Sequence, residues 1–440
     1  MDDFQVELLH RLPLGQSVLA LFAHAFAPPF LNDLFEKHRG QCYERVLSFA
    51  GMVDLTRDAL LVYEGSAQQA FEHAREKGQL PVAFQNAYGK LGRIPEELSV
   101  ALLREGSRRL EALLPLQGCP AAVRLPASLA GMAVVAVDGK KLKKAAKRLK
   151  ALRELPGKML AAKLLVAMNV RSGLAVAMSV DRDGERNDVP LVPALLPQVR
   201  DRIVGAILWM ADRQFADLNL PGQFIGRQDH ILLRCGKTMG FYGDPQRPLQ
   251  QLSDAKEREI VQEWGYIGNP KDRRRRYVRR ITLKRPGEED VILITDLLDE
   301  RQYPAEDLLE VYLQRWGIEK MFQVVTEVFA LQRLIGSTPQ AGIFQGALCL
   351  LLYDMIQLIK TYVAKDAQQE LPKVSTQKLF MDVEEELRVW AKMGDVEQAK
   401  RSLGQPKSDA QMRAWLDQKL SGLWTERWLK ARPKKKTTKW

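Results

Sequence analysis

Residues 131–141 read "GMAVVAVDGKK", and residues 205–215 read "GAILWMADRQF". Each stretch is a run of apolar residues typical of a buried strand, and the runs end in Asp138 and Asp212. If these strands are neighbours, both acids emerge at one edge of the sheet. Gathered carboxylates repel each other unless a cation lies between them, and their oxygens suit Mg²⁺ or Mn²⁺. The two stretches therefore predict a metal site at a sheet edge.

The sequence between and after these stretches predicts the rest of an α/β region. "KMLAAKLLVAMNV" (158–170) and "LAVAMSVDRD" (174–183) predict two further strands joined by turn residues. "VPLVPALLPQV" (189–199) predicts a helix despite its prolines. Asp188 and Glu185 precede that helix and are not assigned to the site. Residues 221–290 are irregular and β-rich, and "DVILITDLL" (290–298) closes them as a strand.

A helix is expected from about Pro304 to Leu331, and it contains "VYLQRWGIEKMF" (311–322). Tyr312, Arg315 and Glu319 follow one another at intervals of three and four residues, so they share one helix face. A surface ion pair between the arginine and the glutamate is one explanation. The other is that Glu319 completes the metal site while Arg315 offers a planar fork to a phosphate.

The two ends of the chain have a helical pattern. Apolar residues recur at intervals of three and four up to about residue 120 and again beyond 345. The last ten residues, "ARPKKKTTKW", form a basic tail in which Lys434, Lys435, Lys436 and Lys439 either add DNA affinity or aid solubility. The apolar run 347–359 contains Asp354 and is too short to span a bilayer. We therefore expect no membrane segment.

Composition indicates a soluble protein with an anionic partner. In 440 residues, Lys plus Arg number 66 against 54 Asp plus Glu, a net charge of +12. Such an excess favours nucleic acid before a membrane surface. The four cysteines are widely scattered without zinc-binding spacing, and the N-terminus is acidic where a signal peptide is basic. A reduced, cytoplasmic location is the simplest interpretation.

An arginine run supplies a candidate surface for the anionic partner. Six arginines fall within residues 273–280, a density that DNA phosphates would balance; a charged hairpin face is the alternative. Alternate strand residues face one way, so Arg274 with Arg276, or Arg273 with Arg275, would act together. The candidate DNA contacts in this run are Arg273, Arg274, Arg275, Arg276, Arg279 and Arg280, and Arg213, next to Asp212, is a further candidate.

The combined motifs resemble those of DDE transposases of bacterial insertion sequences, in the subgroup marked by a Tyr-Arg-Glu signature (insertion-sequence family four type, within the RNase H-like and retroviral-integrase superfamily). Tyr312, Arg315 and Glu319 have the intervals of that signature, and "VDGKK" and "ADRQF" resemble the first two acidic motifs. The resemblance covers roughly residues 130–345. The chain departs from the pattern at Thr326, where the family has a lysine, and at Gln323, which is often basic in the family.

The resemblance implies a fold and a division into domains. The expected class is α/β: an RNase H-like mixed sheet with flanking helices, a β-rich insertion before the last catalytic helix, and all-α N-terminal and C-terminal regions. It implies a helical DNA-binding domain at 1–125, a catalytic domain at 126–345 with the insertion at about 221–290, and a helical domain at 346–440 with the basic tail, for DNA contact or dimerisation.

The resemblance also implies an activity. Asp138, Asp212 and Glu319 would be catalytic and would hold Mg²⁺ or Mn²⁺, as two ions. The substrate would be double-stranded DNA at terminal inverted repeats, cut by water, passed through a hairpin and joined to target DNA by a dimer assembled on the ends. Tyr312 and Arg315 would contact DNA, and Trp264 would stack on a flipped base, with a core tryptophan as its alternative. A nuclease that does not join DNA, and a non-catalytic DNA-binding relative, remain the alternative functions.

Overall fold

The computed structural model of the chain divides into two compact units, one formed by residues 123–322 and the other by residues 1–122 together with 323–440. We describe each unit by itself. The residues whose structure is described are 7–8, 11–42, 44–120, 122–142, 162–216, 218–219, 221–225, 228–236, 239–254, 257–269, 271–329, 331, 333, 335–393 and 408–430. The basic tail discussed above lies outside them.

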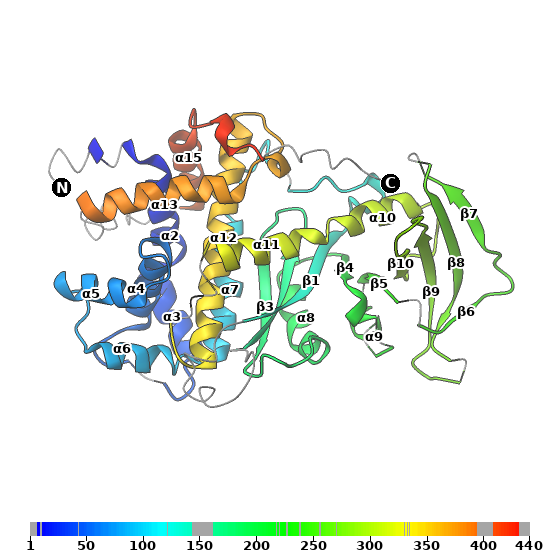
Figure 1. The fold of residues 1–440 in the computed structure, drawn as a ribbon, viewed down its shortest axis with the longest axis horizontal. Helices are drawn as coiled ribbons and strands as arrows, with labels where there is room; N and C mark the ends of the chain where they lie inside the picture. The colour runs from blue at the N-terminus through cyan, green and yellow to red at the C-terminus, as the bar shows by residue number, and fades with distance from the viewer. Residues whose placement is uncertain are drawn as a thin grey trace. The chain divides into compact units, whose positions relative to one another are not determined.

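A ten-stranded mixed sheet forms the centre of unit 123–322, in the order β3-β2-β1-β4-β5-β10-β9-β8-β6, with β7 paired to β8 (Figure 1). β1 is parallel to β4, and β4 is parallel to β5, whereas β2 and β3 are antiparallel to their neighbours. This arrangement of the first five strands is the RNase H-like order, and it confirms the expected fold class. The strands are β1 (Ala133–Lys141), β2 (Lys163–Asn169), β3 (Ala175–Asp181), β4 (Ile207–Ala211), β5 (His230–Arg234), β6 (Phe241–Gly243), β7 (Gln250–Ser253), β8 (Glu259–Ile267), β9 (Arg276–Leu283) and β10 (Val291–Thr295).

The β-rich segment continues the central sheet instead of forming a separate one. β10 pairs antiparallel with β5 on one side and with β9 on the other. β5 itself is the fifth strand of the RNase H-like order, so the added strands begin only after Arg234. The segment expected at 221–290 therefore contributes one strand to the central fold before the chain leaves it.

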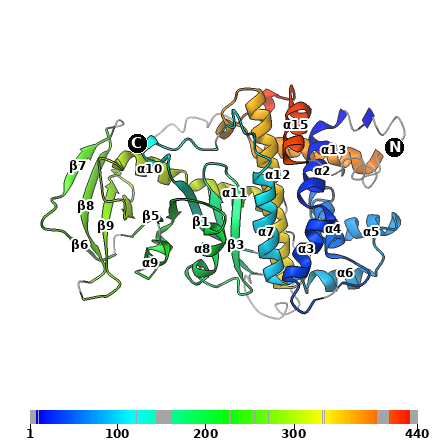
Figure 2. The ribbon, with the colours of Figure 1, turned by 180° about the vertical axis from the view of Figure 1, so that it is seen from behind.

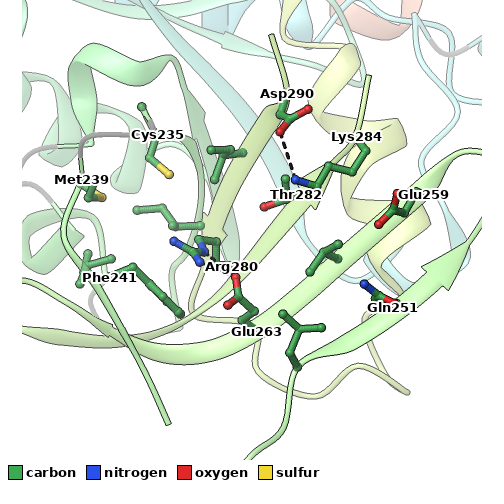
Figure 3. A pocket seen from close by; sticks show the side chains of 16 residues that line it. Cys235, Met239, Phe241, Gln251, Glu259, Glu263, Arg280, Thr282, Lys284 and Asp290 are labelled. Atoms are coloured by element: carbon green, nitrogen blue, oxygen red, sulfur yellow. Dashed lines mark hydrogen bonds and ion pairs between the residues drawn. The ribbon is translucent and has the colours of Figure 1, made fainter. Parts of the chain in front are cut away.

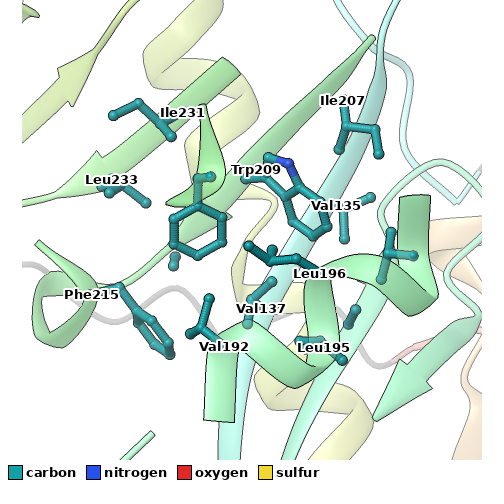
Figure 4. Packing of buried hydrophobic residues seen from close by; sticks show 14 of the residues in the cluster. Val135, Val137, Val192, Leu195, Leu196, Ile207, Trp209, Phe215, Ile231 and Leu233 are labelled. Carbon is teal, nitrogen blue, oxygen red and sulfur yellow. The ribbon is translucent and has the colours of Figure 1, made fainter. Parts of the chain in front are cut away.

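Packing of α8 (Val192–Arg200) assigns the two faces of the sheet. Val135 and Val137 of β1, with Trp209 of β4, join Leu195 and Leu196 of α8 in one buried apolar cluster (Figure 4). The predicted helix at 189–199 is confirmed, with a 3₁₀ turn at its start. Because alternate strand residues face opposite sides, the even-numbered residues of β1 and β4 face away from α8.

The prediction of one continuous helix from Pro304 to Leu331 is wrong. The segment consists of two helices, α10 (Ala305–Leu313) and α11 (Trp316–Glu327). At the junction the amides of Gln314 and Arg315 bond three residues back, to Val311 and Tyr312, and those of Gly317 and Ile318 do the same. These tight turns break the regular ladder, so Tyr312 lies on one helix and Glu319 on the next.

Helices form the described part of the other unit, as the apolar periodicity predicted. They are α2 (Pro13–Ala25), α3 (Pro28–His38), α4 (Phe49–Leu61), α5 (Ala67–Glu76), α6 (Phe84–Leu91), α7 (Glu96–Glu111), α12 (Pro339–Asp366), α13 (Thr376–Met393) and α15 (Asp409–Leu420). α7 and α12 lie side by side (Figure 2), and α12 also packs against α2, α4, α13 and α15. Segments from both ends of the chain therefore share one core.

The central helix α12 corrects the expectation that the apolar run at 347–359 is too short for a bilayer. The helix has 28 residues, and by length and composition alone it is able to cross a membrane; α2 and α3 pass the same test only as a pair bent by 47°. The most apolar window of α12 is entirely buried within the protein. This burial is what the core helix of a bundle shows, since its apolar surface is covered by neighbouring helices.

Candidate active site

Asp138 and Asp212 lie on neighbouring parallel strands, as the sequence predicted. Asp212 directly follows β4, but Asp138 lies within β1, which continues to Lys141, so the expectation that its strand ends at Asp138 is wrong. The register pairs Val137 of β1 with Ala211 of β4, so the two acids occupy the next positions along their strands. Both lie on the face turned away from α8, because they alternate with the buried Val137 and Ala211. The fold thus brings the two carboxylates to one sheet edge from positions far apart in the sequence.

Backbone amides orient both carboxylates. Oδ1 of Asp138 accepts a hydrogen bond of 2.8 Å from the amide of Gly139. Oδ1 of Asp212 accepts one of 3.0 Å from the amide of Gln214, which caps the short 3₁₀ turn Arg213–Phe215. Each acid therefore keeps a second oxygen that these bonds do not use.

Arg315 lies between the acids of the strand edge and the acid of α11. Its Nη2 is 2.7 Å from Oε1 of Glu319, and its Nη1 is 3.9 Å from Oδ2 of Asp138. Arg315 is only 5% exposed, and its buried Nε has no hydrogen-bond partner among the described residues. The guanidinium is the cation that balances these carboxylates in this structure, and it is held by the helix junction described above.

The acids nevertheless carry more negative charge than one arginine offsets. Burial raises the pKa of Asp138 to about 7 against the opposing bond from Gly139, and nearby Asp212 and Glu319 add to the rise. Burial also raises the pKa of Asp212, although the amide of Gln214 and the charge of Arg315 oppose it. A carboxylate whose ionised form is this costly gains from a bound cation.

Tyr312 is buried beneath this edge. Its hydroxyl donates a long hydrogen bond of 3.4 Å to the carbonyl of Ala211, the residue before Asp212. Burial raises the pKa of its phenol to about 12, so the group stays protonated at neutral pH. A protonated, buried phenol is a poor nucleophile. The expected contact of Tyr312 with DNA stays a prediction, and the ring is buried in this structure.

The donor types fit a divalent ion, but the acids do not form a closed metal cage. In the described ranges, no three Asp, Glu, His or Cys side chains come close enough together to hold one ion. Mg²⁺ commonly takes only one or two carboxylates and completes its shell with water and substrate phosphate oxygens. Asp138, Asp212 and Glu319 are the residues that would hold such ions, and this assignment stays a prediction.

The arginine run does not form one surface, which corrects the alternation argument. β9 begins only at Arg276, so Arg273, Arg274 and Arg275 lie in the preceding turn. Arg274 is bonded to Asp272 and Asn219, and the guanidinium of Arg275 lies 4.8 Å from the ring centre of Tyr266. The exposed residues Arg273 to Arg276 remain candidate DNA contacts.

The two arginines inside β9 contact the protein itself. Arg279 is 0% exposed and bonds Oε1 of Gln262 and the carbonyl of Tyr303. Arg280 forms an ion pair with Glu263. Both side chains are held by contacts within the sheet. A charged group that is withdrawn from water needs neighbouring groups to pair with its charge and accept its hydrogen bonds. In this conformation Arg279 does not reach a surface on which DNA would lie, whereas Arg280 is partly exposed and stays a predicted contact.

Trp264 lies in the core, which is the alternative that the sequence left open for it. It is 0% exposed, and its indole Nε1 donates to the carbonyl of Leu298 at 2.9 Å. Arg247 covers one face of the ring at 4.0 Å. No base is able to stack on this indole unless the segment around Leu298 moves away. Arg213, in contrast, is exposed and lies 3.8 Å from Glu289.

A groove of about 530 Å³ opens on one face of β8 and β9, away from the acids (Figure 3). Its charged lining includes the ion pairs Arg280–Glu263 and Lys284–Asp290. Phe241 lies against the guanidinium of Arg280 at 4.0 Å. These cations are already paired, so the groove offers no excess charge to a polyanion.

One buried acid near the site was not assigned to it from the sequence. Asp188 is 2% exposed and forms an ion pair with Lys163, and the side-chain amide of Gln214 donates to it. Its carboxylate also lies against Gly139, where a Cβ atom would be 2.1 Å from Oδ1. The only signal in the sequence was its position before α8, which many surface residues share.

A family model described as "Transposase DDE domain" matches residues 130–355. No curated protein matches the chain. Among solved structures, the chain is similar to the one described as the cryo-EM structure of the piggyBac transposase synaptic complex with hairpin DNA, with 10% sequence identity, coverage of 92% of this chain and 85% of that chain, and a TM-score of 0.41.

Proposed function

The chain belongs to the transposase DDE domain family, and we propose that it is a metal-dependent DNA transposase that cuts DNA at the terminal inverted repeats of its element and joins the ends to a target. The observation that carries the proposal is the sheet edge. Two partly buried acids lie next to each other where the pairing of adjacent parallel strands ends, and Glu319 of α11 and Arg315 of the preceding helix junction reach the same place.

The reaction is a pair of phosphoryl transfers. A water oxygen forms a bond to phosphorus, the bond from phosphorus to the 3′ oxygen breaks, and a 3′-hydroxyl is freed beside a 5′-phosphate. That hydroxyl then attacks a phosphorus of the opposite strand to give a hairpin, or of the target DNA to join it, and in either case the bond from that phosphorus to its 3′ oxygen breaks and frees another 3′-hydroxyl. Divalent ions held by Asp138, Asp212 and Glu319 would activate the attacking oxygen and offset charge on the leaving one.

The chain's own groups would bind and orient the DNA. Arg315 presents a planar fork that matches two phosphate oxygens, and a phosphate near Asp138 would compete with Glu319 for it. Tyr312 supports the end of β4 through Ala211. The exposed arginines Arg273 to Arg276 and Arg213 would contact the DNA backbone. A dimer assembled on two DNA ends, and membership of the Tyr-Arg-Glu subgroup, are parts of the same proposal.

The test is cleavage of the element's end DNA with Mg²⁺ or Mn²⁺, resolved on a denaturing gel, beside Asp138→Ala, Asp212→Ala and Glu319→Ala. We expect the wild type to cut and all three variants to bind the DNA without cutting it. Binding is checked separately by mobility shift. If the Glu319→Ala variant still cuts the DNA, Glu319 is not a metal ligand and its ion pair with Arg315 is purely structural. A precleaved end offered with target DNA separates a transposase from a nuclease that does not join.

A second candidate function is a non-catalytic DNA-binding protein. Two observations favour it. Thr326 and Gln323 stand at positions that are often basic in the Tyr-Arg-Glu subgroup, and Arg315 already balances the charges of Asp138 and Glu319. In the same experiment such a protein binds end DNA and never cuts it with either metal ion. The two functions therefore give different results in one assay.

A further inference from the structure

Asp188 is a buried acid that joins two parts of the candidate active site. It lies just before the 3₁₀ turn Val189–Leu191 that leads into α8, on the face of the sheet opposite to Asp138 and Asp212. Its ion-pair partner, Lys163 of β2, is buried as well. Burying two charges usually adds little net stability, because the loss of hydration offsets their attraction. The pair therefore calls for an explanation beyond stability.

One contact leads from Asp188 to Asp212. The side-chain amide of Gln214 donates to Oδ2 of Asp188, while the backbone amide of the same residue donates to Oδ1 of Asp212. Gln214 thus ties the two acids together through one residue of the 3₁₀ turn. The negative charge of Asp188 also contributes to the raised pKa of Asp212, after burial, which agrees with their proximity.

A second contact leads from Asp188 to Asp138. The carboxylate of Asp188 fills the space where a side chain on Gly139 would stand. The amide of Gly139 is the donor that orients Asp138. Asp188 therefore packs against the backbone of the residue after Asp138 and hydrogen-bonds the residue two positions after Asp212.

We propose that Asp188 is a positioning residue that fixes the turns at Gly139 and Gln214 and so aims the carboxylates of Asp138 and Asp212 at a shared metal ion. Lys163 neutralises Asp188, so this fourth acid does not itself compete for the ion. The proposal rests on the proposed function. Groups that orient metal-binding residues typically contribute about 10–100-fold to metal affinity.

The experiment measures Mn²⁺ binding to the full chain by electron paramagnetic resonance of the free ion. The variants are Asp188→Asn, which keeps an acceptor for Gln214 but loses the charge, and Gln214→Ala, which cuts the tie to Asp212 without stranding a buried charge. We expect both to weaken Mn²⁺ binding about tenfold or more and to raise the Mn²⁺ concentration for half-maximal cleavage by a similar factor. Binding of end DNA should change less than about twofold, since neither residue is a DNA contact in this proposal.

Asp229→Asn is the matched control. Asp229 is also a buried acid of the same unit, paired with Arg200 at 2.6 Å and bonded to the indole of Trp209, but it precedes β5 at the other edge of the sheet. It should lower the melting temperature about as much as Asp188→Asn and leave Mn²⁺ binding within about twofold of the wild type, because it touches neither acid. If Asp229→Asn weakens Mn²⁺ binding as much as Asp188→Asn does, the effect of Asp188 is only a general loss of stability and the positioning role is refuted.

The double variant Lys163→Gln, Asp188→Asn removes both buried charges and replaces the single variant if stranded Lys163 prevents folding. Asp138→Ala separates this inference from the proposed function. If Asp138→Ala retains Mn²⁺ binding, the metal site itself is wrong. If Asp138→Ala abolishes binding while Gln214→Ala and the Asp188 variants bind Mn²⁺ as the wild type does, only the positioning role is refuted.

Discussion

The acidic edge at β1 and β4 and the arginine-rich strand β9 belong to one sheet, yet they balance their charges differently. In β9, Arg279 is enclosed by Gln262 and Tyr303, and Arg280 is paired with Glu263. At the acidic edge, one arginine serves several carboxylates, and Asp138 keeps a raised pKa. Charge density in the sequence was greatest at the arginines. The unbalanced charge, which a ligand would complete, is at the acids.

The largest expected effect is on catalysis at the acidic edge. Asp212→Asn should lower the rate of end cleavage by at least about 10³-fold, since losing a metal ligand removes several kcal/mol of transition-state stabilisation. The measurement is single-turnover cleavage with saturating DNA and Mn²⁺. Asp181→Asn, at the end of β3 beside Arg186, is the matched acid and should change the rate less than about twofold. If both variants lose cleavage rate to a similar extent, Asp212 has no special role compared with Asp181.

The next effect is on folding at β9. Arg279→Met should lower the free energy of unfolding by about 3 kcal/mol, because Gln262 Oε1 and the Tyr303 carbonyl lose their buried donor. Arg273→Ala, in the exposed turn, should stay within about 0.5 kcal/mol of the wild type. Urea unfolding followed by tryptophan fluorescence compares them. If Arg279→Met is as stable as the wild type, β9 does not depend on its internal pairing.

A smaller effect of opposite sign is expected from Asp138→Asn without metal. The folded pKa of about 7 exceeds the ordinary value of 3.8, so the folded state holds the proton more tightly and stability falls as pH rises from about 4 to 7. At pH 8 in EDTA, the variant should be more stable than the wild type, and the two should converge near pH 4. Urea unfolding at both pH values measures this. A variant that is less stable at pH 8 would mean that the pairing with Arg315 outweighs burial.

The smallest effect is on nonspecific DNA binding. Arg273→Ala should reduce the slope of log affinity against log salt by about 1, the loss of one phosphate contact. Arg280→Ala should change that slope by much less, because Glu263 already neutralises the side chain. Fluorescence anisotropy with random duplex DNA at several salt concentrations distinguishes them. If both variants change the slope equally, the exposed turn and β9 do not differ in their contact with DNA.

Sequence alone predicted most of the sheet edge. The apolar runs before Asp138 and Asp212 gave the correct strands, because a doubly covered parallel strand reads as a continuous apolar segment. The register that places them side by side was not in the sequence, since it depends on the crossover between β1 and β4. The break before Trp316 was also missed, because periodicity continues across a single tight turn.

Residues whose role depends on packing were the hardest to predict. Arg279 looked like a DNA contact in a basic run, and Trp264 was a candidate only through the family resemblance; the segments around Leu298 and Tyr303 make both internal. Asp188 is the opposite case, since nothing local distinguishes it from a surface acid. Its partners Lys163 and Gln214 are distant in sequence, so only tertiary structure brings them together.

The order of the units along the chain has a consequence for synthesis. Unit 123–322 interrupts the helical unit, so the ribosome makes roughly 200 residues between α7 and its partner α12. At about 5–20 residues per second, the part of α7 that packs on α12 waits on the order of 10–40 s without that partner, a period in which chaperones would bind it; α2 and α3, its other partners, are made before it. The sheet and its acids are complete before that wait ends. A chain cut short just after residue 322 would therefore hold all three acids and only the first part of the helical unit.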